Sequence, residues 1–153
     1  MLTYHPLTRS DQILLRPILK AAFDEDSRIH TSSPKGGPTG YENGILLQQL
    51  TDRPNSISKS IFLNHQLIGA YVISFLDNMY VLDLLFLDPD VASRGIGSQV
   101  WRDIERDYAS AKLWVVETPD YSLRNHHFYE KNGFCKCKEY IYSEDCRSYI
   151  YVK

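Results

Sequence analysis

The chain has 153 residues, which suits one domain with a substantial core. It contains 17 Lys and Arg residues and 19 Asp and Glu residues, so it lacks the excess of positive charge that nucleic-acid binding requires. Hydrophobic residues make up 43%, and no apolar run approaches the roughly 18 residues of a membrane helix. We therefore expect a single domain over residues 1–153, without a nucleic-acid or membrane partner.

The first part of the chain predicts a short strand over residues 2–7 and then a helix. Ser10 and Asp11 can cap this helix, and Pro17 either kinks it or marks its true start. Its apolar positions follow a helical spacing: Leu14, Leu15, Ile18, Leu19 and Ala22. The N-terminal residues 1–6 show no signal-peptide pattern.

A long loop is predicted over residues 24–44. Residues 31–40 alone contain three glycines and two prolines, and a loop of this length in a compact domain is usually functional or mobile. Residues 45–50 then predict a short second helix.

The middle of the chain predicts three strands. Residues 58–63 and 67–76 form a hairpin, and the nearly unbroken apolar run 80–87 indicates a strand buried on both faces. Asp83 is the one charge in this run. Strict alternation places Asp83 on the face of Val81, Leu85 and Leu87, opposite Tyr80, Leu82, Leu84 and Phe86.

The remaining elements complete an α/β pattern. An amphipathic helix follows Gly95, and a strand over 112–116 precedes a helix over 122–131. Residues 134–141 and 148–152 predict an antiparallel pair. The order of elements indicates a mixed, largely antiparallel sheet of about seven strands flanked by helices.

Three cysteines lie near the end of the chain: Cys135, Cys137 and Cys146. The Cys135-x-Cys137 spacing has no second ligand pair, so we expect small apolar side chains on one strand face and no metal. Free thiols suit a reducing compartment, which favours a cytoplasmic protein.

Gly95-Ile96-Gly97 follows the apolar strand and begins the amphipathic helix. Glycines let a phosphate approach the backbone, and the free N–H groups of a first helical turn attract anions. Arg94 can add a charged contact. The alternative is a plain strand-to-helix turn. A dinucleotide-binding turn is disfavoured because the glycines lie mid-chain and no third glycine follows.

Residues 128–134, Phe-Tyr-Glu-Lys-Asn-Gly-Phe, predict the end of a helix capped by Gly133. Tyr129 is the functional candidate, because a phenol held in a fixed position can donate a proton. The alternative is a ring that packs while its hydroxyl meets water.

Together, Ala92-Ser93-Arg94-Gly95-Ile96-Gly97 and the run 128–134 resemble the GCN5-related N-acetyltransferase (GNAT) family. The resemblance covers roughly residues 79–141 and implies the acyl-CoA N-acyltransferase fold. The family pattern has Gln or Arg where this chain has Ala92. The turn is therefore expected to hold a pyrophosphate mainly through N–H groups from Arg94 to Ser98.

The resemblance also implies roles for further residues. Leu85, Phe86 and Leu87 would pair with the pantetheine arm of coenzyme A, and Tyr129 would be the general acid. Ser122 stands where the family often has an asparagine that contacts the cofactor. Asn125, one helical turn before Tyr129, can serve instead.

A general base is also needed, because an amine of the lysine type has a pKa of about 10.4. Asp83 is the first candidate, since burial would raise its pKa toward a useful value. Its alternative role is pairing with a cation or facing water. Glu117, at the end of the next strand, is second, and the acidic residues 24–26 could attract a cationic substrate or form a solvated helix end.

The sequence thus predicts an N-acetyltransferase that moves an acetyl group from acetyl-CoA, without a metal, to a primary amine of a small molecule or peptide. The alternative is a non-catalytic sensor or interaction module that binds coenzyme A on the same fold. A homodimer is left open. Acceptor specificity is expected in the 24–44 loop and in the C-terminal strands, which carry Tyr140, Tyr142, Tyr149 and Tyr151.

Overall fold

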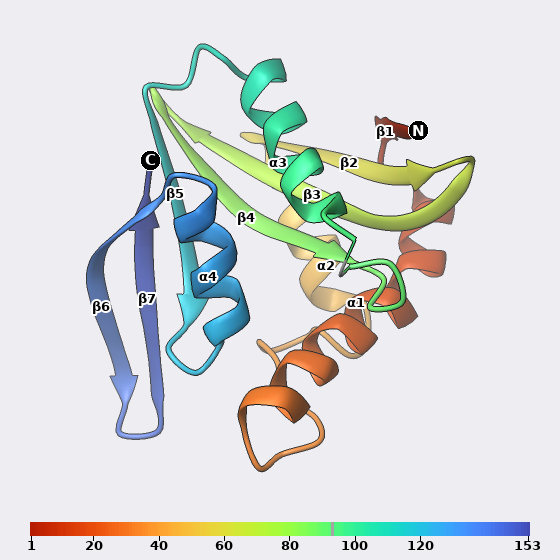
Figure 1. Cartoon of the computed structure of the whole chain (residues 1–153). Coiled ribbons are helices and arrows are strands. Elements are labelled where there is room, and N and C mark those ends of the chain that lie inside the picture. Colours follow the sequence, from red (N-terminus) through yellow and green to blue (C-terminus); the bar gives the residue numbers. More distant parts are fainter. Residues whose placement is uncertain (93) are drawn as a thin grey trace.

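The computed structural model describes residues 1–92 and 94–153, and these form one sheet with helices on both faces (Figure 1). The elements are β1 (Leu2–Pro6), α1 (Arg9–His30), α2 (Ile45–Thr51), β2 (Ser56–Leu63), β3 (Gln66–Leu76), β4 (Met79–Leu87), α3 (Ile96–Asp107), β5 (Leu113–Pro119), α4 (Leu123–Lys131), β6 (Cys135–Ser143) and β7 (Cys146–Val152). The described residues give a seven-stranded sheet in the order β1-β2-β3-β4-β5-β7-β6. Neighbouring strands are antiparallel except β4 and β5, so the predicted mixed sheet is confirmed.

Helix α1 is longer than the sequence predicted. Thr8, and not Ser10, is its N-cap, and it forms a capping box with Asp11 through two hydrogen bonds of 3.1 Å. Pro17 lies inside the helix on its exposed side, where water can satisfy the carbonyl of Ile13 that loses its partner. The helix ends at His30, so the segment 24–30, predicted as loop, is helical.

Two apolar clusters lie on opposite faces of the sheet. On one face, α1 and α2 pack Leu15, Leu19 and Leu47 against β3 and β4. On the other face, Trp101 of α3 and Tyr129 of α4 pack against residues of β3, β4, β5 and β7. β4 contributes buried residues to both clusters, which confirms its predicted burial on both faces.

A β-bulge in β4 overturns the predicted alternation around Asp83. Ile73 of β3 pairs with Leu82, and the residue before it, Val72, pairs with Leu84. Asp83 therefore has no partner among the described residues of β3 and is the extra residue of the bulge. Leu82 therefore belongs to the α3-side cluster, whereas Leu84 belongs to the α1-side cluster. The prediction that Leu82 and Leu84 share a face was wrong, because one inserted residue shifts the alternation by one position.

β4 and β5 separate soon after they meet. Their parallel pairing runs from Met79–Leu113 through Tyr80–Trp114 to Val81–Val115 and ends there. The following parts of the two strands, 82–87 and 116–119, diverge, as the fold of Figure 1 shows. The sheet thus contains an opening at its centre, beside the backbone of β4.

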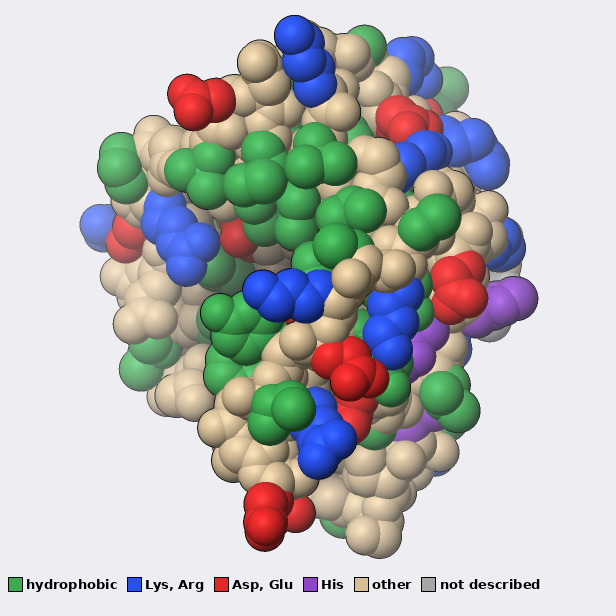
Figure 2. Space-filling view, turned by 90° about the vertical axis from the view of Figure 1, so that its left-hand side faces the viewer, with side chains coloured by type: hydrophobic (Ala, Val, Ile, Leu, Met, Phe, Trp, Pro, Cys, Tyr) green, Lys and Arg blue, Asp and Glu red, His purple; other side chains and the backbone are tan. Residues whose placement is uncertain are grey.

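Strand β6 is an exposed edge, and it corrects the prediction for the cysteines. Cys135, Cys137 and Cys146 are free and exposed. Cys137 lies at a bulge between Lys136 and Lys138, and all residues of β6 are exposed. Cys135 and Cys137 therefore do not form the apolar strand face that the sequence predicted. Seen from the side of β6 and β7, the surface gathers hydrophobic side chains with Lys and Arg among them (Figure 2). The exposed hydrophobic residues of β6 are Tyr140, Ile141 and Tyr142.

Residues 1–92 and 94–153 contain neither a membrane-spanning helix nor a metal cluster. No helix in these ranges combines the length and the apolar character needed to cross a membrane. In the same ranges, no three His, Cys, Asp or Glu side chains come together in a way that could hold a metal ion.

Candidate functional site

A cavity of about 340 Å³ lies where β4 and β5 separate. Its wall is formed by the end of α1, the second half of β4, the following turn and α4. The lining residues are Ala22, Phe23, Glu25, Asp26, Leu85, Phe86, Leu87, Pro89, Ala92, Gly97, Arg124, Asn125, Phe128 and Tyr129. The structure thus brings together the predicted strand residues 85–87, the glycine turn, Asn125 and Tyr129.

The glycine turn has the geometry expected for an anion site. Gly95 is the N-cap of α3 with φ +74°, a left-handed conformation that favours glycine. The N–H groups of Ile96, Gly97 and Ser98 form the first turn of α3, where an α-helix supplies no acceptor. Arg94 beside them is exposed, whereas Ser93 of the motif lies outside the described residues.

Gly97 and Ser98 also connect the turn to α4. A Cβ atom on Gly97 would lie 3.1 Å from the ring of Phe128, so the absence of a side chain lets α4 pack closely against α3. The buried hydroxyl of Ser98 accepts a hydrogen bond of 3.1 Å from Asn132 Nδ2. The side chain of Ser98 therefore has a structural role, and its N–H group is the part that can face a ligand.

A second cavity, of about 190 Å³, adjoins the turn. It is lined by Ala92, Gly95, Gly97, Ser98, Arg124, His127, Phe128 and Lys131. Arg124 and Lys131 bring positive charge from α4 to the turn in which Ala92 carries none. These two residues were not predicted from the sequence, although their separation of seven positions places them on one face of a helix.

Tyr129 is buried, and its side chain lines the larger cavity. Burial raises the pKa of its phenol well above the ordinary tyrosine value, and the negative charge of Asp26 raises it further. The phenol therefore stays protonated at neutral pH, and Tyr129 presents a neutral O–H group at the cavity wall.

Asn125 and Ser122 differ in what they can contact. Asn125 lines the cavity and donates a hydrogen bond of 3.3 Å to Thr118 Oγ1. Ser122 is fully buried, and its hydroxyl donates to Asp26 Oδ1 at 2.8 Å. Asn125 is thus available to a ligand, whereas Ser122 joins α4 to α1.

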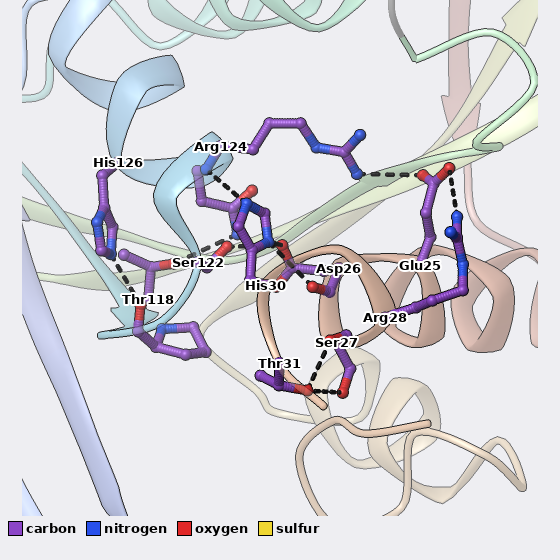
Figure 3. Close-up of polar contacts among 12 residues, drawn as sticks. Glu25, Asp26, Ser27, Arg28, His30, Thr31, Thr118, Ser122, Arg124 and His126 are labelled. Atoms are coloured by element: carbon purple, nitrogen blue, oxygen red, sulfur yellow. Dashed lines mark hydrogen bonds and ion pairs between the residues drawn. The ribbon is translucent and has the colours of Figure 1, made fainter. Parts of the chain in front are cut away.

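The end of α1 and the start of α4 are connected by a polar network (Figure 3). Arg124 Nη2 pairs with Glu25 Oε2 at 3.1 Å, and the backbone N–H of Arg124 donates to His30 Nε2 at 3.3 Å. His30 Nδ1 in turn lies 3.1 Å from Asp26 Oδ1. This network was not predicted from the sequence, because residues 24–30 were expected to form a loop.

Comparison with known proteins agrees with this geometry. The model of the acetyltransferase (GNAT) family matches residues 19–134. The chain belongs to the GNAT family. An uncharacterised protein of Bacillus subtilis (strain 168), YrkN, is 33% identical over 101 residues, which cover 64% of this chain and 54% of YrkN. The matched part thus spans about half the length of that relative.

Solved structures show the same GNAT fold at low sequence identity. An acetyltransferase from Thermus thermophilus has a TM-score of 0.78 at 19% identity and covers 100% of this chain and 96% of its own. PaiA N-acetyltransferase from Thermoplasma acidophilum, solved with coenzyme A, has a TM-score of 0.77 at 16% identity, with coverage of 100% and 98%. The ribosomal-protein-S18-alanine N-acetyltransferase from Escherichia coli has a TM-score of 0.75 at 14% identity, with coverage of 99% and 92%.

Within this GNAT domain, Asp83 lies outside the lining of the cavity. Its carboxylate accepts a hydrogen bond from Ser74 and pairs with Arg53 Nη1 at 3.4 Å. Burial raises the pKa of the Asp83 carboxyl, and the Ser74 hydrogen bond and the Arg53 charge offset this only in part. The structure therefore realises the alternative interpretation of Asp83, a carboxylate paired with a cation.

Glu117 also lies outside the lining, but its surroundings differ. It is exposed on β5, two residues after Val115, the last residue that pairs with β4. Its carboxylate accepts hydrogen bonds from Tyr142 and from Ser148 Oγ, the latter at 2.5 Å. Residues of β6 and β7 thus hold Glu117 next to the opening in the sheet.

Proposed function

We propose that this GNAT domain transfers an acetyl group from acetyl-CoA to a primary amine of a small molecule or peptide. The observation that carries the proposal is the shared cavity of about 340 Å³, which β4, the glycine turn and Tyr129 line together. Structural neighbours crystallised with coenzyme A or acetyl-CoA support the choice of cofactor. The cavity residues fit that cofactor, which combines an extended amide arm with a pyrophosphate.

Separate parts of the site would bind the two parts of the cofactor. The backbone of residues 85–87 borders the opening where β5 has diverged, so its polar groups can pair with the pantetheine arm. The first turn of α3 would bind the pyrophosphate through N–H groups. Arg124 and Lys131 would supply the charge that Ala92 does not.

The chemistry is direct attack. The amine nitrogen bonds to the thioester carbonyl carbon, the carbon–sulfur bond breaks, and the thiolate takes a proton from Tyr129. The proton lost by the amine goes to a base, for which Glu117 is the better candidate. Asp83 is paired with the cation Arg53, whereas Glu117 accepts hydrogen bonds from the hydroxyls of Tyr142 and Ser148 and is exposed beside the opening of the sheet.

The charge of the cavity supports an amine acceptor. Glu25 and Asp26 at the end of α1 bring two carboxylates to the lining, which carries one cation, Arg124, among its described residues. Carboxylates at a site attract a protonated amine and disfavour an anionic acceptor. This is the part of the chain in which acceptor specificity was predicted.

Two measurements test the proposal and separate it from the sensor alternative. Acetyl-CoA at 100 times its dissociation constant should stabilise the fold by roughly 2.7 kcal/mol, and no thermal shift at millimolar ligand would contradict both hypotheses. Release of free thiol with a panel of amines then identifies an enzyme. Binding without thiol release for any amine would leave the sensor.

The role of Tyr129 has its own test. Tyr129→Phe should lower kcat roughly 10²-fold or more, because the leaving thiolate loses its proton donor. Tyr80→Phe is the matched control, since the Tyr80 hydroxyl contacts Ser110 and lies outside the cavity lining. Equal rates for Tyr129→Phe and Tyr80→Phe would show that the acid is another group.

A further inference from the structure

Arg124 lies between the acidic end of α1 and the glycine turn. Its guanidinium pairs with Glu25 at 3.1 Å, which connects α4 to α1 across the larger cavity that both residues line. Arg124 also lines the smaller cavity beside the glycine turn. One side chain is thus shared by the wall of the larger cavity and by the expected phosphate site.

The surroundings of Arg124 allow its side chain to move while its backbone stays in place. The backbone N–H is held by His30 Nε2 at 3.3 Å, and the nearby Ser122 is held by Asp26 at 2.8 Å. The side chain, in contrast, is 50% exposed and its partner Glu25 is 25% exposed. A rotation of the Arg124 side chain therefore needs no change in the position of α4.

The energies favour an exchange of partners. An exposed ion pair contributes about 0.2–1 kcal/mol, because water competes for both charges. A phosphate offers arginine a bidentate, charge-assisted contact that is stronger than an ordinary hydrogen bond. Glu25 has a second cation within reach, since Arg28 Nη2 lies 3.7 Å from its Oε1. Glu25 would therefore keep a partner after Arg124 leaves.

We propose that Glu25 competes with the phosphate groups of coenzyme A for Arg124. In the free protein Arg124 pairs with Glu25 across the cavity between α1 and α4. When coenzyme A binds, Arg124 contacts its phosphates instead and no longer pairs with Glu25. Glu25 is then a cavity-lining carboxylate without Arg124 beside it, which suits the entry of an amine. This inference rests on the proposed cofactor. It adds that the Glu25 carboxylate weakens cofactor binding, because Arg124 must leave Glu25 before it can contact the phosphates.

The test measures dissociation constants by calorimetry for two ligands, coenzyme A and pantetheine, which lacks the phosphates. The proteins are the wild type, Glu25→Gln, Arg124→Gln and the double variant. Glu139→Gln is the matched control, since Glu139 also forms an exposed ion pair, with Lys136 at 3.2 Å, but lies outside both cavity linings. Glu25→Ala is a second variant without the carboxylate, for use if Glu25→Gln folds poorly.

Glu25→Gln should bind coenzyme A roughly two- to fivefold more tightly than the wild type, as expected for loss of an exposed ion pair. It should leave pantetheine binding unchanged, and it should have no effect in the Arg124→Gln background. Glu139→Gln should bind coenzyme A like the wild type.

The competition would be overturned if Glu25→Gln and Glu25→Ala bound coenzyme A as the wild type does, or more weakly. It would also be overturned if Glu25→Gln had the same effect with and without Arg124. Neither result would contradict the proposed function. A wild-type protein that does not bind coenzyme A at millimolar concentration would overturn the proposed function as well.

Discussion

The Ser122 hydroxyl donates a hydrogen bond of 2.8 Å to Asp26 Oδ1, and both side chains are buried. The two residues are 96 positions apart and lie at the end of α1 and directly before α4. Because Asn125 and Tyr129 follow on α4, this contact positions the wall of the cavity that carries the proposed acid.

Ser122→Ala should therefore destabilise the domain. The substitution leaves a buried carboxylate oxygen of Asp26 with one partner fewer, which costs about 1–3 kcal/mol. Thermal unfolding without ligand measures the effect. Ser110→Ala is the control, because Ser110 is exposed and contacts the Tyr80 hydroxyl. Equal melting temperatures for the two variants would show that the Ser122 contact contributes little.

Asp83→Asn should change stability in a pH-dependent way. Burial raises the pKa of the Asp83 carboxyl in the folded state, so the wild type loses stability as pH rises from the unfolded pKa to the folded pKa. The asparagine variant lacks this titration. Its stability relative to the wild type should therefore increase as pH rises from about 4 toward neutrality. Urea unfolding at several pH values measures the difference, and a constant difference would show that Ser74 and Arg53 fully compensate for burial.

Gly95 and Gly97 should respond differently to substitution. Gly95 has φ +74° but open space around it, so Gly95→Ala should cost about 1–2 kcal/mol from backbone strain, and Gly95→Asn should cost less. Gly97→Ala gains up to about 1 kcal/mol of helix propensity but places a Cβ 3.1 Å from the Phe128 ring, so it should cost less than Gly97→Asn, whose larger side chain must also fit beside that ring. Thermal unfolding of the four variants tests this ordering. A smaller loss for Gly97→Asn than for Gly97→Ala would mean that α4 moves aside easily.

Local patterns predicted the fold and much of the site. The apolar run 80–87, the glycines at 95 and 97, and the run 128–134 are short segments whose geometry depends on near neighbours. They placed residues 85–87, Asn125 and Tyr129 in one site, and the structure brings them to one cavity. The spacing of Arg124 and Lys131 predicts that they share one face of a helix. It does not predict that this face lies beside the glycine turn, which is what makes their charge relevant to a phosphate.

The sequence by itself determined the family, the sheet and the glycine turn, because these follow from spacing and from backbone preferences of adjacent residues. Tertiary structure decided the positions of the charged groups. The bulge at Asp83 arises from the register between β3 and β4, and the Asp83 carboxylate pairs with Arg53 outside the cavity lining. The contacts of Glu25 and Asp26 with α4 span almost a hundred positions. Such partners are chosen by packing of distant elements, which no local pattern records.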